Sequence, residues 1–187
     1  LLDLGTTDWL EGVAASAGLA VAVGDEGAIY TTSTGTNWTR RPQSFTTWLR
    51  GVACNSSGVF VAVGEGGFIA TSSDGTTWRQ RAIGVSEDLN RVVWLTNRFA
   101  AAGNSGRVLV GDTTGANWSV IERSNGPTND LYAVAGHCGL LSTNLMVAGA
   151  NEVRLLQNNG AGWVNQMDPA RNLPAPDWTY YCGFAQG

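Results

Sequence analysis

The chain has 187 residues and a formal net charge of −4 at pH 7, and 14% of its residues are charged, against roughly 25% in an average soluble domain. The length is sufficient for one well-filled domain, and the acidic balance argues against a nucleic-acid-binding protein, which usually carries a basic face. No apolar run approaches the roughly 20 residues that a membrane-spanning helix requires, so we predict no membrane span. Because Thr, Ser and Asn take the place of charged side chains, we expect an extracellular, cell-surface or periplasmic location.

The chain consists, in order, of a short leading segment, four copies of one unit and a partial fifth copy. Residues 1–8 are too short for a unit and are expected to supply one outer strand. The four units span residues 9–47, 48–88, 89–130 and 131–177, and residues 178–187 restart the pattern as a first strand. We expect residues 1–187 to form a single domain.

The second unit shows the pattern most clearly. Phe60–Val63 is an apolar run of strand length that is rich in β-forming residues. Gly64–Gly67 follows as a compact hairpin connection, in which Gly is expected to supply the positive φ angles that such turns need. Ser72–Trp78 is predicted to be a second turn, in which the Asp74 side chain accepts hydrogen bonds from backbone N–H groups just ahead of it. The Trp78 ring is expected to pack beneath this turn.

Landmarks of this unit recur along the chain. A tryptophan follows the second turn at spacings of 40, 40 and 45 residues, and a glycine stands three residues before each of these tryptophans. The tryptophans are Trp38, Trp78, Trp118 and Trp163, and the hairpin glycines at matching positions are Gly24, Gly64, Gly103 and Gly149. A period near 40 with four strands per repeat is typical of a β-propeller blade. We therefore predict an all-β propeller, or propeller segment, of four-stranded antiparallel blades.

Blade geometry predicts where the strands and the core lie. The first strand of a blade is expected to line the central channel and the fourth to lie at the rim, and stacking of blades buries both faces of each sheet. In the second blade the strands are expected near residues 49–53, 59–63, 68–72 and 77–81. The predicted core consists of apolar residues on the first three strands: Val13, Val52, Val92, Val134, Val23, Val63, Phe60, Phe68, Ile29 and Ile69.

Two segments of the second blade resemble known repeats. Ser72-x-Asp74-Gly75-x-Thr77-Trp78 resembles the Asp-box, the bacterial neuraminidase repeat. Val61-Ala62-Val63-Gly64-x-x-Gly67-x-Ile69 resembles the repeats of the photosystem II assembly factor family. The resemblance covers residues 9–165 and implies a propeller fold. It says little about function, because sialidases, xyloglucan hydrolases, sortilin-type receptors and assembly factors all carry Asp-boxes.

The box residues are interpreted as structural. Asp74, Gly75 and Trp78 are expected to form the turn, and Trp38, Trp118 and Trp163 repeat the tryptophan. Where the second blade has Asp74, the other blades have Thr34, Thr114 and Asn159. Thr and Asn can form weaker versions of the same bond to the backbone, whereas a catalytic carboxylate would not be replaced so freely.

The residues do not form a recognisable catalytic pattern, so we predict that the protein is not an enzyme and binds no cofactor or metal. A sialidase site needs an arginine cluster, which the blade registers do not assemble. A glycoside hydrolase, a less favoured alternative, needs two facing carboxylates, whereas the acidic residues here mostly fall in turns. His137 is the only histidine and is expected in a surface loop. Cys54, Cys138 and Cys182 lack zinc-ribbon spacing, and both one disulfide and three reduced thiols fit their number.

The preferred function is a non-catalytic scaffold for protein interaction or assembly, because propellers present loops on two faces and a rim. Arg40, Arg41, Arg79 and Arg81 are predicted to form a basic strip on the rim that binds a protein partner. The alternative for these arginines is that they are solvated and protect an outer edge strand from aggregation.

The alternative function is a carbohydrate-binding, lectin-like propeller. Tryptophan rings are suited to stacking on sugars, and Trp94 and Trp178 are the candidates because the other tryptophans fall in the box or at blade junctions.

The strand count predicts that this chain does not stand alone as a closed monomer. The single strands expected before Asp8 and after Trp178 are not neighbours in a blade, so they cannot pair directly. Exposed strand edges are normally covered or paired. We expect the missing strands to come from a partner chain, a second copy or further sequence, and the protein to act as a subunit of a larger extracellular complex.

Overall fold

The computed structural model describes residues 6–16, 18–121, 126–138, 143–150, 152–157 and 162–165. These residues form 16 β-strands in four antiparallel sheets of four strands each, and no α-helix occurs among them. In every sheet the strands are hydrogen-bonded in chain order, so that each sheet is one blade. The predicted all-β fold of four-stranded antiparallel blades is confirmed.

The bounds of the strands follow the repeat. The first blade contains β1 (Leu10–Ser16), β2 (Leu19–Gly24), β3 (Ile29–Thr32) and β4 (Thr39–Arg40). The second contains β5 (Leu49–Cys54), β6 (Phe60–Gly64), β7 (Ile69–Ser72) and β8 (Arg79–Arg81). The third contains β9 (Leu89–Leu95), β10 (Arg98–Gly103), β11 (Val108–Gly111) and β12 (Trp118–Val120). The fourth contains β13 (Leu131–Cys138), β14 (Thr143–Gly149), β15 (Glu152–Gln157) and β16 (Gly162–Asn165).

The strands of the second blade lie within about two residues of their predicted positions. The prediction that His137 lies in a loop was wrong. The β13–β14 ladder continues past it, through the pair His137–Asn144 and on to Cys138–Thr143. The predicted partial blade of residues 178–187 lies outside the described residues, as do residues 1–5.

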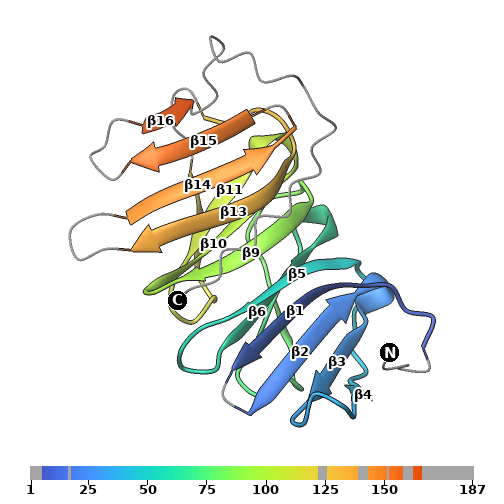
Figure 1. Ribbon diagram of the computed structural model, residues 1–187. Coiled ribbons are helices and arrows are strands. Elements are labelled where there is room, and N and C mark those ends of the chain that lie inside the picture. Colours follow the sequence, from blue (N-terminus) through green and yellow to red (C-terminus); the bar gives the residue numbers. More distant parts are fainter. Residues whose placement is uncertain are drawn as a thin grey trace.

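The blades follow one another from the first, in blue, to the fourth, in orange, and these two lie at opposite ends of the described molecule (Figure 1). The first strands β1, β5, β9 and β13 contact one another in that order. Gly12 permits the close approach of β1 to β5. A Cβ atom at Gly12 would lie 3.1 Å from the Gly51 Cα atom and 3.1 Å from the Val52 nitrogen. The first strands of the first two blades therefore pack backbone against backbone at this point.

Apolar side chains fill the three spaces between neighbouring blades. Between the first two blades, Val21 and Ile29 pack against Phe60 and Phe68, and all four are buried. Nine of the ten predicted core residues are buried, and the exception is Val13, which is 68% exposed. Val13 lies on the face of the first blade that is turned away from the second, and in the described structure no further blade packs there.

The hairpins that follow β2, β6 and β10 use glycine for two different reasons. Gly66 and Gly67 have φ angles of 63° and 71°, which is the positive φ that the sequence predicts for this turn. Gly64 has a φ of −169°, which is ordinary extended backbone, so a positive φ there was a wrong prediction. Gly64 is required by space instead, because a Cβ atom would overlap the carbonyl oxygen of Trp48.

Candidate functional site

The turn after β7 is held by the Asp74 carboxylate. Its Oδ1 atom accepts hydrogen bonds from the backbone N–H groups of Thr77 at 2.7 Å and Thr76 at 2.8 Å, and from the Ser72 hydroxyl at 2.9 Å. The bond from Thr77 is the largest cause that holds the pKa of Asp74 well below its usual value. In this geometry the Oδ1 atom bonds to three groups of its own turn.

The tryptophans that follow the box turns are anchored by their indole N–H groups. Trp78 and Trp118 each donate Nε1–H to the carbonyl oxygen of the glycine three residues earlier, at 3.1 and 2.8 Å. Their rings pack against the cores between blades one and two and between blades two and three, respectively. Trp38 packs within the first blade against Ala22, Ala28 and Tyr30. The Trp163 side chain lies outside the described residues.

The third blade holds its turn with an aspartate that sequence reasoning missed. Asp112 Oδ1 accepts the backbone N–H of Thr114 at 2.9 Å, and Oδ2 accepts the Asn117 amide at 2.6 Å. Burial alone would raise the pKa of Asp112, but hydrogen bonds from Thr114 and Asn117 outweigh burial and lower it. Asp112 stands three residues before its turn glycine, where the second blade has Ser72, and this offset is the signal that identifies it.

Replacing Asp74 with alanine is expected to lower the free energy of unfolding at pH 7 by about 1 kcal/mol, the usual net contribution of one hydrogen bond. Because the folded-state pKa is depressed, this contribution is fully present above the unfolded-state pKa of about 3.9. It is lost as the pH falls through that value toward the folded-state pKa. Urea titrations of both proteins at neutral and acidic pH measure the difference. Unchanged stability together with loss of a binding activity would refute the structural interpretation.

The box glycines of the second and third blades pack on the preceding blade. A Cβ atom at Gly75 would lie 2.6 Å from Leu19 Cδ2 and 3.1 Å from Val21 Cγ2. At Gly115 it would lie 2.5 Å from Val61 Cγ2. At Gly35, in the first blade, it would meet no atom within 4 Å, although the φ angle of 79° is similar. The box turns of the second and third blades thus form part of a blade junction, whereas the turn of the first blade does not.

Substitution of the box glycines is expected to show this difference. Gly35→Ala places a side chain at positive φ, which costs about 1–2 kcal/mol. Gly75→Ala has the same backbone cost and adds overpacking against the first blade, for about 1–3 kcal/mol more. Equal losses of stability for the two variants, measured by urea unfolding, would contradict the inferred packing of the box turn on its neighbour.

The four candidate arginines of the rim differ in their surroundings. Arg41 and Arg81 stand at equivalent positions, and each donates Nε–H to a threonine hydroxyl of its own blade, at 2.8 and 2.9 Å. Arg40 forms an ion pair with Asp8 at 3.1 Å. Arg79 is exposed on β8. Three of these guanidinium groups thus bond within the chain, and the binding of a protein partner by this strip stays a prediction.

A polar cluster lies where the first strand of the second blade begins. Arg50 Nη2 lies 2.9 Å from Glu65 Oε1 and 3.7 Å from Asp88 Oδ2, and the guanidinium carbon lies 5.2 Å from the centre of the Trp48 ring. Arg91 Nη1 donates to the Arg50 carbonyl oxygen at 3.0 Å. Arg50 is thus paired with two carboxylates and is not part of an arginine cluster that could receive a substrate carboxylate.

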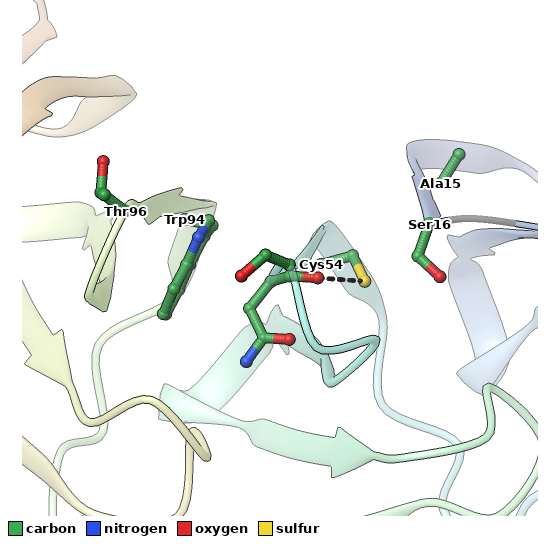
Figure 2. Close-up of a pocket in the computed structure, with 7 residues that line it drawn as sticks. Ala15, Ser16, Cys54, Trp94 and Thr96 are labelled. Atoms are coloured by element: carbon green, nitrogen blue, oxygen red, sulfur yellow. Dashed lines mark hydrogen bonds between the residues drawn. The ribbon is translucent and has the colours of Figure 1, made fainter.

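A cavity of about 440 Å³ opens at the other end of the first strands. Trp94 and Thr96 lie on one side of it, Ala15 and Ser16 on the other, and Cys54 between them (Figure 2). The Trp94 ring is half-buried, and its centre lies 4.8 Å from that of Phe99. Its equivalents in the first two blades are Ala15 and Cys54, so the repeat itself does not require an aromatic ring here.

Cys54 is a free thiol, and burial raises its pKa. Within the described residues, no group of three His, Cys, Asp or Glu side chains is arranged to hold a metal ion. In the same part of the chain, no helix has the length and apolar character needed to cross a membrane. The side chains of Cys138 and Cys182 lie outside the described residues, and so does Trp178.

Large exposed hydrophobic side chains occur, among the described residues, only at the two end blades. Trp9 is 66% and Val13 is 68% exposed beside or on β1, and Tyr132 is 50% and Met146 is 39% exposed on β13 and β14. The second and third blades, which have a neighbour on each side, expose none.

Comparison with known proteins supports the fold. No family model matches the sequence, and no curated protein matches it. Among solved structures, the chain is similar to YCF48 bound to D1 peptide, with 24% identity and a TM-score of 0.61 over 88% of this chain and 55% of that one. It is also similar to YCF48 from Cyanidioschyzon merolae, with 17% identity and a TM-score of 0.66 over 88% and 58% of the two chains. The WD40 β-propeller domain of Doa1 matches with 13% identity and a TM-score of 0.65 over 81% and 52%.

These matches define the class of fold as a β-propeller. The predicted resemblance to the photosystem II assembly factor family is confirmed at the level of the fold, since two of the similar structures are YCF48. The chain spans about half the length of the structures it matches.

Proposed function

We propose that this chain is a non-catalytic propeller scaffold that binds a protein partner. The observation that carries the proposal is that, among the described residues, the large exposed hydrophobic side chains all lie in the first and fourth blades, as Trp9, Val13, Tyr132 and Met146. Exposed apolar patches on soluble proteins are typical of protein interaction sites. A similar propeller, YCF48, has been solved with a bound D1 peptide, so this fold can present a surface to a protein segment.

The polar groups support the same proposal. Asp74 and Asp112 bond to their own turns, and Arg50 is paired with Glu65 and Asp88. Each of these groups already has a structural partner, which weighs against its use in a glycosidase or sialidase site. The Asp74 turn geometry also supports a relationship to the Asp-box repeats.

We place the scaffold in a larger extracellular complex. The support for this location is the low charged fraction and the abundance of Thr, Ser and Asn. The experiment that tests the interaction is affinity capture with wild-type chain and with Val13→Asp, followed by titration of the purified candidate protein. A partner that binds wild type at least tenfold more tightly than the variant supports the proposal. A partner that binds both equally, or the lack of any saturable partner, contradicts it.

A carbohydrate-binding function is favoured by one specific observation, the Trp94 cavity. A half-exposed aromatic ring beside the hydroxyl groups of Ser16, Ser56 and Thr96 offers an apolar platform with polar neighbours, as ligand pockets do. Saturable quenching of tryptophan fluorescence by a sugar, lost in Trp94→Ala and retained in Val13→Asp, would favour this function over the scaffold. If wild type bound no sugar, the carbohydrate-binding function would be ruled out.

A further inference from the structure

The cavity beside Trp94 is lined by uncharged residues of the first three blades. They lie at the ends of β1, β5 and β9 and in the turns that follow β5 and β9. Charged groups that belong to these strands, such as Arg50, Glu65 and Asp88, lie at the opposite ends of the strands. A charged ligand in the cavity would lose water without gaining an ion-pair partner, so the lining favours an uncharged one.

Trp94 is the residue of this cavity that departs most from the repeat. The strand registers place Ala15, Cys54 and Gly136 at the matching positions of the other three blades. Figure 2 shows the Trp94 ring nearly edge-on, with one face turned toward Cys54 across the cavity. A half-buried indole with an open face offers a flat apolar surface on which a ligand can stack.

Two hydroxyl groups beside this ring are open to a ligand. Thr96 has a φ angle of 53°, a left-handed conformation that β-branched residues rarely adopt because it is strained. Its side chain lines the cavity, and so does that of Ser56 in the exposed turn after β5. Neither hydroxyl makes a hydrogen bond within the part of the chain that the structure describes. The turn after β9 therefore keeps a strained threonine where its hydroxyl meets the cavity.

We infer that the cavity binds a neutral pyranoside with equatorial hydroxyl groups, stacked on Trp94 and hydrogen-bonded to Thr96 and Ser56. Such a sugar carries C–H bonds on its two faces and hydroxyls around its edge, which matches an indole face bordered by hydroxyls. The cavity volume of about 440 Å³ falls within the range of roughly 300–1,000 Å³ found for small-molecule pockets. This inference rests on the carbohydrate-binding alternative and names its class of sugar.

A matched pair of sugars tests the inference. Methyl β-glucopyranoside and methyl β-glucuronide differ only in the group on carbon 5, which is a hydroxymethyl in the first and a carboxylate in the second. Saturation-transfer NMR with wild type measures weak binding of both. We expect the glucoside to bind about fivefold or more tightly than the glucuronide, because no cation lines the cavity. The axial hydrogens of one face of the glucoside should receive more saturation than those of the other face.

Variants separate binding from folding. Trp94→Ala should abolish binding and Trp94→Phe should retain it in weakened form, but both changes alter a ring that packs near Phe99. Thr96→Gly avoids this difficulty, because it relieves the positive φ and should leave the protein at least as stable as wild type while weakening binding. Gln80→Glu, on the exposed rim strand β8, should bind the glucoside as wild type does.

Ser56→Arg adds a gain of function to the test. The new guanidinium at the edge of the cavity can pair with a carboxylate, so this variant should bind the glucuronide more tightly than the glucoside. Equal binding of the two sugars by wild type, or preference for the glucuronide, would overturn the inference and leave a carbohydrate-binding function standing if Trp94→Ala abolished it. Binding of neither sugar, or glucoside binding that Trp94→Ala leaves unchanged, would overturn both the inference and a sugar site at this cavity.

Discussion

Replacement of Phe60 by alanine is expected to lower the free energy of unfolding by about 3–5 kcal/mol. Phe60 is 1% exposed and lies in the cluster that joins the first two blades. Removing the ring loses the burial of its apolar surface and leaves a cavity between two sheets, which a paired β-ladder cannot easily collapse to fill. Urea unfolding followed by circular dichroism measures the change.

The matched variant is Phe60→Leu, which keeps most of the apolar volume. It should cost less than about 1.5 kcal/mol, because volume-conserving apolar substitutions are tolerated best. If Phe60→Ala were as stable as wild type, the cluster between the first two blades would not be a core, and the assignment of residues 60–63 to a buried second strand would be wrong.

Replacement of Trp78 by alanine is expected to cost roughly 3–5 kcal/mol, through loss of a large packed side chain and of one hydrogen bond. The ring packs against the core between the first two blades, and Nε1 donates to the Gly75 carbonyl oxygen at 3.1 Å. The variant should therefore weaken both the box turn and the junction to which that turn contributes. Thermal and urea unfolding both report the loss.

Trp78→Phe separates the two contributions. The phenyl ring retains most of the packing, while the indole N–H and its bond to the turn are lost. We expect a cost of about 1–3 kcal/mol, because Gly75 is buried and its carbonyl oxygen loses the hydrogen-bond donor that Trp78 supplies. A loss as large as that of Trp78→Ala would show that the hydrogen bond, and not the packed ring, dominates at this position.

The sequence predicts the repeated parts of this fold well, because each copy supports the others. The strands of the second blade, the buried residues Phe60 and Ile69 and the positive φ of Gly67 all follow from a pattern seen several times. The prediction for Val13 fails for the same reason. Its copies at Val52 and Val92 are buried because a neighbouring blade covers them, whereas no blade among the described residues packs on Val13, and the local sequence of the first blade does not contain that information.

The sequence pattern misses other features because a structural role can move from one position of the repeat to another. In the third blade the turn carboxylate moves from the position of Asp74 to that of Ser72, and Asp112 performs the same bonding from there. The rim arginines illustrate a second limit. Arg41 and Arg81 repeat in sequence, but their hydrogen bonds to threonines on the neighbouring strand depend on the strand register, which the sequence does not state.

Hydroxyl-radical footprinting tests most directly the central claim that this propeller binds its partner through the exposed faces of its end blades. Trp9, Tyr132 and Met146 are readily oxidised side chains, and all three are exposed in the end blades. We predict that Trp9 and Met146 are oxidised less in wild type with its partner bound than in Val13→Asp under the same conditions, while Trp78 is oxidised equally in both. Equal oxidation of Trp9 and Met146 in the two proteins, with protection instead at Trp94 or along the rim, would contradict the account.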